Sequence, residues 1–241
     1  WEEAMFPQSK YIMVIDDLAD RPHTCDLLLD QNLGRSEQDY DGLLKGKLTT
    51  LVGPKYALLR PDFAAQRMQS LARRQSKPQL RRLLIIMGGV DKDNATGLVL
   101  SALQSCTLPA DMSVTVVMGS HAPWLTQVQA QAAQMPWHTE VLVGVDNMAQ
   151  LMAASDLAIG AAGGTAWERC SLGLPSLVLA LAKNQLPGAV ALQKVGAAVA
   201  IETPQQLKGF MESLQTTATY TEEMLTNLSN AAASVTDGEG C

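Results

Sequence analysis

A glycine pair, a carboxylate and two amides follow one another between residues 155 and 185, and their chemistry suits a ligand with phosphate and hydroxyl groups. The Gly163-Gly164 pair lets the backbone approach a phosphate closely. Glu168 offers two acceptor oxygens, which match the two hydroxyl donors of a ribose diol. The Asn184-Gln185 pair suits sugar hydroxyl or acetamido groups. These residues form the first candidate site.

The same residues have a purely structural interpretation. Thr165 and Glu168 have the spacing of a capping box, in which Thr165 caps a helix and Glu168 reaches back to the start of that helix. Asn184 and Gln185 could likewise cap a helix. The structural and the functional interpretations do not exclude each other.

A second glycine pair, Gly88-Gly89, follows an apolar stretch and precedes Val90 and Asp91. Glycines in this place can accept unusual dihedral angles and let a phosphate approach. The alternative is a tight turn in which Asp91 or Asp93 is the N-cap of the next helix. A lone pair of glycines does not decide between them.

Three other groups are weaker candidates. In residues 145–148 (VDNM), Asp146 is either a helix N-cap or part of a loop whose backbone contacts the edge of a base. Tyr56 and Arg60 lie in the segment GPKYALLRPDF, where the arginine is either solvated or binds phosphate bidentately. The Asp16-Asp17 pair is either a paired-carboxylate site or a set of strand-end caps.

The elements that position these residues are those of a parallel sheet. Residues 156–162 and 175–182 are continuous apolar runs, typical of strands buried on both faces, and a short helix joins them. Ligands bind at the carboxyl ends of such strands. The same alternation predicts strands at 83–89, 113–120, 140–145 and 197–201, and helices at 94–105, 125–134 and 146–155. Thr203 and Pro204 are the expected N-cap and first residue of the next helix.

The chain is predicted to be an α/β protein with one complete Rossmann-like domain and the remnant of a second. Before residue 76 the pattern gives strands at 10–17, 26–30 and 48–52, a polar loop at 32–44 and a helix at 62–74. These helices are too few to cover both faces of a sheet. The basic stretch 73–82 (RRQSKPQLRR) is the candidate linker. We therefore expect the end of an incomplete domain and the linker at residues 1–76, a nucleotide-binding domain at 77–241, and a chain that is a fragment of a longer protein.

Composition argues against several classes of protein. The net charge of −6 argues against general nucleic-acid binding. No window approaches ~18 consecutive apolar residues, so no membrane span is expected, and the start lacks the features of a signal peptide. The cysteines are scattered without metal-ligand spacing, which predicts reduced thiols in a cytoplasmic protein and no metal site. They are Cys25, Cys106, Cys170 and Cys241.

Six motifs occur in an order that carries a family resemblance. They are IDDLADR, CDLLLDQN, GPKYALLRPDF, MGGVDKDN, AGGTAWE and AKNQ, which span nearly the whole chain. The chain resembles the UDP-sugar hydrolases of pseudaminic acid biosynthesis. That family in turn resembles the C-terminal half of the MurG-type glycosyltransferases, which implies a GT-B arrangement of two Rossmann-like domains around a cleft.

The resemblance implies a reaction and a set of site residues. Water attacks the anomeric carbon of UDP-2,4-diacetamido-2,4,6-trideoxy-β-L-altropyranose and UDP leaves, with neither a metal nor a cofactor. Glu168 would hold the ribose, Asn184 and Gln185 would face the sugar or phosphate, and Asn184 is the candidate that orients substrate or water. The implied UDP contacts are Gly88, Gly89, Val90, Asp91, Val145, Met148, Gly163, Gly164, Thr165 and Glu168, and the implied substrate contacts are Tyr56, Arg60, Asn184 and Gln185.

One family feature has no counterpart in these residues. The family carries a G-x-G-H segment whose histidine is the expected general acid/base, and His23, His121 and His138 do not lie in such a context. The expectation is that this chain binds UDP without turning over the UDP-sugar. A glycosyltransferase of the same fold and a non-catalytic nucleotide-sugar-binding module stay open as alternatives.

Overall fold

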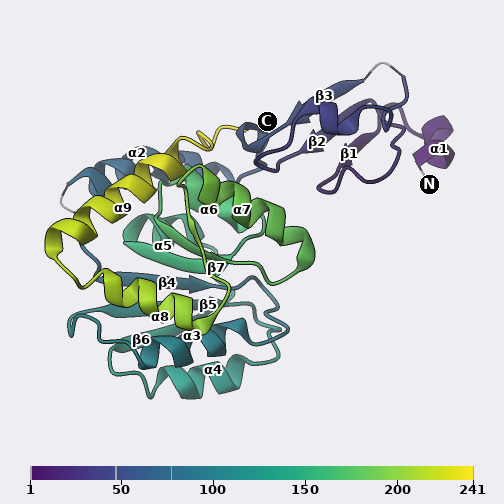
Figure 1. The fold of residues 1–241 in the computed structure, drawn as a ribbon. Coiled ribbons are helices and arrows are strands. Elements are labelled where there is room, and N and C mark those ends of the chain that lie inside the picture. Colours follow the sequence, from purple (N-terminus) through teal and green to yellow (C-terminus); the bar gives the residue numbers. More distant parts are fainter. Residues whose placement is uncertain (1, 47, 77, 241) are drawn as a thin grey trace.

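A computed structural model describes residues 2–46, 48–76 and 78–240, and it contains two separate parallel sheets (Figure 1). The larger sheet has six strands in the order β6-β5-β4-β7-β8-β9, and all neighbouring strands run parallel. This is the order of a doubly wound fold, in which the chain direction across the sheet reverses between β4 and β7. The strands are β4 (Arg82–Ile86), β5 (Ser113–Met118), β6 (His138–Val143), β7 (Leu157–Ala161), β8 (Ser176–Leu179) and β9 (Val199–Ala200).

Helices cover both faces of this sheet, as the alternating pattern predicts. One face carries α3 (Ala95–Gln104), α4 (Leu125–Ala132) and α8 (Pro204–Ser213). The other carries α2 (Pro61–Gln75), α5 (Met148–Ala154), α6 (Thr165–Ser171), α7 (Leu186–Lys194) and α9 (Ala218–Ala233). Along β4, Leu83 and Ile85 enter the first core and Leu84 and Ile86 the second, so the strand is apolar throughout.

Local signals account for some helix boundaries. Thr203 is the N-cap of α8, its hydroxyl accepts the Gln206 N–H at 3.2 Å, and Pro204 is the first helical residue, as predicted. Helices α7 and α9 were not predicted from the sequence pattern.

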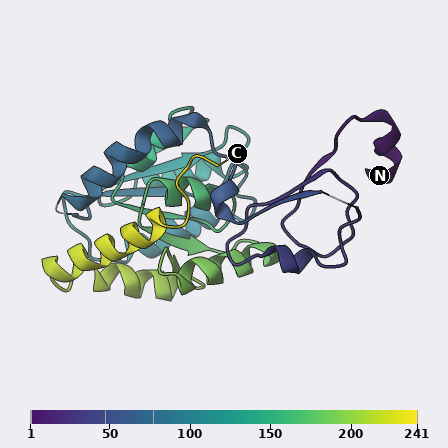
Figure 2. The same ribbon diagram turned by 90° about the horizontal axis from the view of Figure 1, so that it is seen from above.

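The smaller sheet has three parallel strands in the order β1-β2-β3, and it lies beside the larger domain together with α1 (Glu2–Met5) (Figure 2). Its strands are β1 (Met13–Ile15), β2 (Leu27–Asp30) and β3 (Thr49–Val52). The strand predicted at 10–17 is shorter than expected, and acidic side chains accept backbone N–H groups near both of its ends. The Asp26 carboxylate accepts the Ile12 N–H at 2.8 Å, and the Asp16 carboxylate accepts the Ala19 N–H at 2.7 Å.

The predicted linker at 73–82 is too long. Arg73 and Arg74 belong to α2, which continues to Gln75, and β4 already begins at Arg82. Helix α2 packs against α5, α6 and α9 of the larger domain. The division at residues 76 and 77 stays a prediction, and the packing of α2 favours an earlier boundary, before Pro61.

Arg74 shows why a basic sequence here is not a flexible connection. Its side chain is buried, and the guanidinium donates to three carbonyl groups at distances of 2.7–3.1 Å. Two of them, of Met152 and Ser155, close the C-terminal end of α5, and the third, of Leu172, is the C-cap of α6. Carbonyl groups at helix C-termini have no partner within the helix and attract cations.

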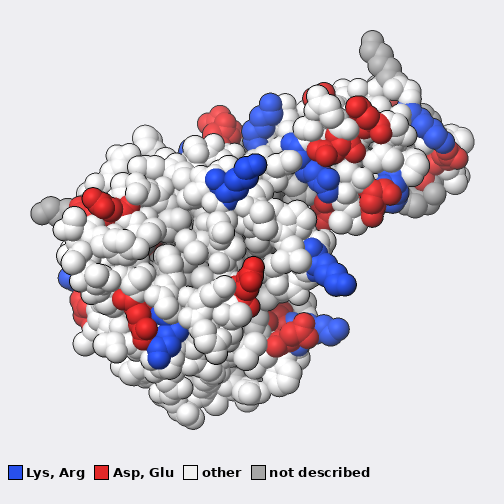
Figure 3. Space-filling model, viewed as in Figure 1, with Lys and Arg blue, Asp and Glu red and all other residues white. Residues whose placement is uncertain are grey.

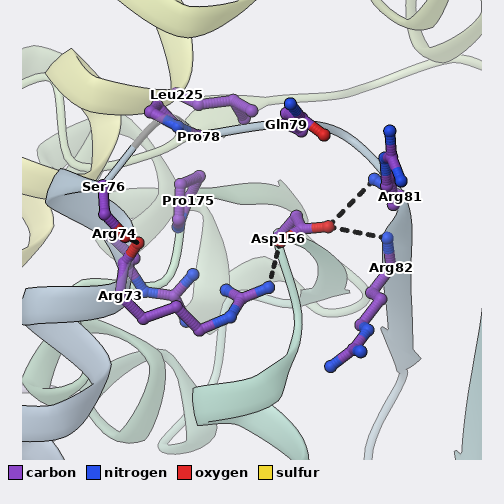
Figure 4. Close-up of a pocket in the computed structure, with 10 residues that line it drawn as sticks. All are labelled: Arg73, Arg74, Ser76, Pro78, Gln79, Arg81, Arg82, Asp156, Pro175 and Leu225. Atoms are coloured by element: carbon purple, nitrogen blue, oxygen red, sulfur yellow. Dashed lines mark hydrogen bonds and ion pairs between the residues drawn. The ribbon is translucent and has the colours of Figure 1, made fainter.

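A neighbouring contact fixes the start of β4 (Figure 4). The Asp156 carboxylate accepts the backbone N–H groups of Arg81 and Arg82 at 2.9 and 2.8 Å and pairs with the Arg73 guanidinium. A hollow of about 250 Å³ lies among these residues. Arg73 pairs with Asp156, Arg74 donates to carbonyl groups, and Arg81 pairs with Asp111. These three arginines, the basic group, therefore stabilise the fold.

Arg74→Met is expected to lower the free energy of unfolding by roughly 2–4 kcal/mol, because three buried carbonyl groups lose a charged donor. Urea denaturation measures the change. Arg82→Met removes an equal charge from an exposed side chain and is the control, with an expected change within about 0.5 kcal/mol. Equal effects of the two substitutions would show that Arg74 does not hold the helix ends.

Candidate functional site

The candidate site residues gather where the strands of the larger sheet end at its centre. The loops after β4 and β7 carry the two glycine pairs, on both sides of the point where the strand order reverses. Gly88 has a φ of 91°, which a residue with a side chain rarely adopts. A Cβ atom added to Gly119, after β5, would lie 2.1 Å from the Gly89 carbonyl oxygen, so the loops after β4 and β5 are in contact. Gly119 was not singled out by the sequence analysis.

Asp91 serves the start of α3. Its carboxylate accepts the N–H groups of Ala95 and Thr96 at 2.8 and 2.9 Å, and the residue is buried. The N-cap itself is Asn94, whose side chain accepts the Gly97 N–H at 3.1 Å, so the prediction of Asp91 or Asp93 as N-cap is wrong. Of the residues predicted in this loop, Gly89 and Val90 are exposed, Gly88 is half-buried, and Asp91 has its carboxylate occupied.

The capping box predicted for α6 does not form. The N-cap is Gly164 and no side chain caps the helix, because the chain enters helical geometry one residue earlier than expected. Thr165 is the first helical residue, and its hydroxyl lies 3.2 Å from Arg169 Nη1. The Glu168 carboxylate therefore has no capping role and makes no side-chain hydrogen bond to the described residues. It is half-buried, and burial raises its pKa against the opposing effect of the Arg60 and Arg169 guanidinium groups.

A cleft of about 470 Å³ separates this edge of the larger domain from the smaller sheet. It brings together four predicted site residues, Gly163, Gly164, Asn184 and Gln185, with the Asp16-Asp17 pair on the opposite wall. Gln31 and Asn32 also line it, and sequence reasoning missed them, although they end the motif CDLLLDQN directly after a strand. The convergence of amides and carboxylates makes the cleft suitable for a polyhydroxylated ligand.

Asn184 and Gln185 form a 3₁₀ turn (Lys183–Gln185) before α7, and neither side chain caps that helix. Gln185 occupies the N-cap position of α7 as the capping alternative allows, but its side chain makes no cap hydrogen bond, and Asn184 is not a cap. The Gln185 side-chain oxygen accepts the Leu181 N–H at 2.9 Å, and a Cβ atom on Gly163 would lie 3.5 Å from Gln185 Nε2. Gln185 thus connects the two loops, whereas Asn184 is exposed in the cleft.

Asp16 and Asp17 differ in their surroundings. Asp16 is buried, which acts to raise its pKa, but the Ala19 N–H and the Tyr40 hydroxyl outweigh burial, and the pKa is lowered. The Tyr40 hydroxyl also lies 2.9 Å from an Asp30 oxygen. His23 is buried between Glu2, at 3.0 Å, and Asp16, at 3.6 Å. Only the Asp17 side chain is exposed, so the two carboxylates do not form an equivalent pair.

The other predicted residues lie apart from this cleft. Arg60 Nη1 donates to the Asp146 carbonyl at 3.2 Å, and the N-cap of α5 is Asn147, so the prediction of Asp146 as N-cap is wrong. Val145 and Met148 are half-buried against the core beside α5. Tyr56 ends a 3₁₀ turn (Pro54–Tyr56), where the Lys55 ammonium lies 4.7 Å from its ring centre.

Charged side chains of both signs are interspersed on the face shown in Figure 3, and they lie closer together over the smaller sheet than over the larger domain. Among residues 2–46, 48–76 and 78–240, no group of His, Cys, Asp and Glu side chains is arranged to hold a metal ion. Cys25, Cys106 and Cys170 are free and buried, and Cys241 lies outside the described residues. Within the same ranges, no helix combines the length and hydrophobicity that a membrane crossing needs.

The free Glu168 carboxylate has a consequence for stability. Its pKa in the folded chain lies above the ordinary value of 4.5, so the folded state holds this proton more tightly than the unfolded state does. The free energy of unfolding therefore falls as the pH rises from the unfolded-state pKa through the folded-state pKa. We expect the stability of Glu168→Gln relative to the wild type to increase between about pH 4 and pH 7. Urea denaturation at both values measures this. A decrease would show that the carboxylate stabilises the helix, as in a capping box.

The model of the glycosyltransferase family 28 C-terminal domain matches residues 83–237. Among curated relatives, the UDP-2,4-diacetamido-2,4,6-trideoxy-beta-L-altropyranose hydrolase of Campylobacter jejuni is 28% identical over 176 residues, which cover 73% of this chain and 60% of the relative. The spore coat polysaccharide biosynthesis protein SpsG of Bacillus subtilis is 30% identical over 156 residues, or 65% of this chain and 44% of that protein. This chain thus spans less than two thirds of either relative.

Among solved structures, MurG of Acinetobacter baumannii aligns with 97% of this chain and 65% of its own, with a TM-score of 0.66 and 17% sequence identity. At this identity the likeness concerns the fold, which is that of the GT-B glycosyltransferases. The family match covers β4 through α9 and therefore every loop at the carboxyl edge of the larger sheet. The chain belongs to the glycosyltransferase family 28 C-terminal domain family.

Proposed function

We propose that this chain binds a UDP-sugar at the carboxyl edge of the larger sheet and is the nucleotide-binding part of a UDP-sugar hydrolase. Its products would be UDP and free 2,4-diacetamido-2,4,6-trideoxy-L-altrose. The name of the Campylobacter relative and the six ordered motifs support this substrate. The family and the fold support nucleotide-sugar binding in general.

The proposal depends on the Glu168 carboxylate, which makes no hydrogen bond to the described residues. Asp91 and Glu168 both lie near the start of a helix that follows a glycine pair. The Asp91 carboxylate accepts two backbone N–H groups, whereas the Glu168 carboxylate accepts none from the described residues. A half-buried carboxylate without a structural partner is costly unless a ligand uses it. Two hydroxyl groups of a ribose would supply two donors to its two oxygens.

The remaining roles follow from position around Glu168. The diphosphate would lie over Gly163 to Thr165 and against Gly88 to Val90, at the point where the strand order reverses. The uracil would lie by Val145 and Met148. The sugar would enter the 470 Å³ cleft, where Asn184 and Gln185 face Asp16 and Asp17. Asp91 would act through its backbone, and Tyr56 and Arg60 would contact the substrate from the segment before α2.

A glycosyltransferase is the second candidate, because the family match and the MurG-like fold favour it. Its nucleotide site would be the same, and the difference lies in the acceptor. A chimera that joins this chain to a relative's G-x-G-H half can be incubated with UDP-sugar in water alone. Free sugar formed at a rate independent of any acceptor identifies a hydrolase, whereas turnover that requires an acceptor identifies a transferase.

Glu168→Gln is expected to weaken UDP binding by roughly 1.5–3 kcal/mol if the charge-assisted ribose contact is lost. Isothermal titration calorimetry measures this loss, with Glu222→Gln on the exposed side of α9 as the matched control. Deoxyuridine diphosphates that lack one ribose hydroxyl should lose less affinity on the Gln variant than UDP does. Unchanged UDP affinity of Glu168→Gln would remove Glu168 from the site.

Residues 1–241 alone are expected to bind UDP without turning over the UDP-sugar. Hydrolysis needs a group that manages the proton of the attacking water. Asn184 and Gln185 are neutral amides, and the Asp16 carboxylate is already held by the Ala19 N–H and the Tyr40 hydroxyl. Chromatography of UDP and free sugar tests this. Release as fast as by the Campylobacter enzyme would place the catalytic group within this chain.

A further inference from the structure

Arg169 is a buried cation at the centre of the larger sheet. Its side chain is 1% exposed and is among the largest fully buried side chains of the protein. Nη2 donates to the Ala161 carbonyl at 2.8 Å, and Nη1 lies 3.2 Å from the Thr165 hydroxyl. The guanidinium therefore contacts both ends of the loop that contains Gly163 and Gly164.

The guanidinium of Arg169 lies against Gly160, where the lack of a side chain leaves space for it. Gly160 of β7 pairs with Ile86, the last residue of β4. A Cβ atom on Gly160 would lie 2.5 Å from Arg169 Nη1, so only a glycine admits the charge here. The guanidinium thus lies where β4 and β7 end, directly before the loops that carry both glycine pairs.

No carboxylate of the described residues lies within ion-pair distance of Arg169, although the Glu168 carboxylate favours its charge from further away. The Nε atom of Arg169 has no hydrogen-bond partner among these residues. Burial lowers the pKa of Arg169 to about 10, so the group remains cationic near neutral pH. Arg74 is buried too, but its Nε, Nη1 and Nη2 atoms all donate to carbonyl groups. An unpaired buried charge is strongly destabilising unless a counter-charge is supplied.

We propose that Arg169 is a positioning residue whose charge is compensated by the phosphates of the bound nucleotide. It holds the loop 161–165 through its two hydrogen bonds and gives that loop a positive potential from beneath. This inference rests on the proposed UDP site. It assigns the positive charge that faces the phosphates to Arg169, whose side chain is buried. The phosphate groups, rather than the base or ribose, would then depend on Arg169.

The test compares the affinities of UDP, UMP and uridine for the wild type and four variants by calorimetry. Arg169→Gln removes the charge but keeps an N–H donor for the Ala161 carbonyl, and Arg169→Met removes both. Arg169→Lys restores the charge. Arg82→Gln removes one positive charge at the opposite end of β4 and is the control. Thermal unfolding without ligand accompanies each variant.

We expect Arg169→Gln to lower UDP affinity about tenfold, UMP affinity less and uridine affinity not at all, since a unit charge acts on each added phosphate charge. Arg169→Lys should recover most of the loss, and Arg82→Gln should bind like the wild type. Equal losses for UDP and uridine, or none for UDP, would overturn the inference and leave the UDP site intact. If the wild type binds no UDP, the proposed function and this inference both fail. If Arg169→Met does not fold, the Gln and Lys variants alone decide.

Discussion

Buried carbonyl groups around α6 need hydrogen-bond donors, and this requirement connects the helix to the rest of the molecule. Arg74 donates to Leu172 at the C-cap, Arg67 donates to Ser171 in the last turn, and Arg169 donates to Ala161 before the first turn. A guanidinium has five N–H donors, so one side chain can serve several carbonyl groups. The position of Glu168 on α6 follows from these contacts, and with it the geometry of the proposed nucleotide site.

The two glycine loops of the sheet differ in how the helix that follows each of them is capped. After β4, the side chains of Asp91 and Asn94 accept backbone N–H groups at the start of α3. After β7 no side chain caps α6, and the Glu168 carboxylate accepts no hydrogen bond from the described residues. We therefore expect polar ligand contacts beside β7 and β8, where the cleft toward the smaller sheet opens.

The periodic pattern of the sequence was sufficient to predict the fold but not the side-chain partners. Apolar runs correctly predicted the doubly wound sheet, because strands buried on both faces leave a signal in sequence. The capping box at Thr165 and the N-cap at Asp146 were wrong, because a shift of one residue at a helix start moves the cap. The linker at 73–82 was too long, because a basic sequence does not reveal that Arg74 is buried against carbonyl groups. Arg169 was missed because the sequence around it does not reveal that its side chain is buried. Gly160 was a possible signal, since a side chain at that position would clash with the Arg169 guanidinium.

Hydrogen–deuterium exchange of the chain with and without UDP can locate the nucleotide site, because it detects the bound ligand without any substitution. We expect slower exchange at residues 88–90, 163–168 and 184–185, with the slowest segment at the start of α6, and no change around Arg73 to Arg82. Protection at that basic group, or no protection at the loops after β4 and β7 at saturating UDP, would contradict a nucleotide site at the carboxyl edge of the sheet.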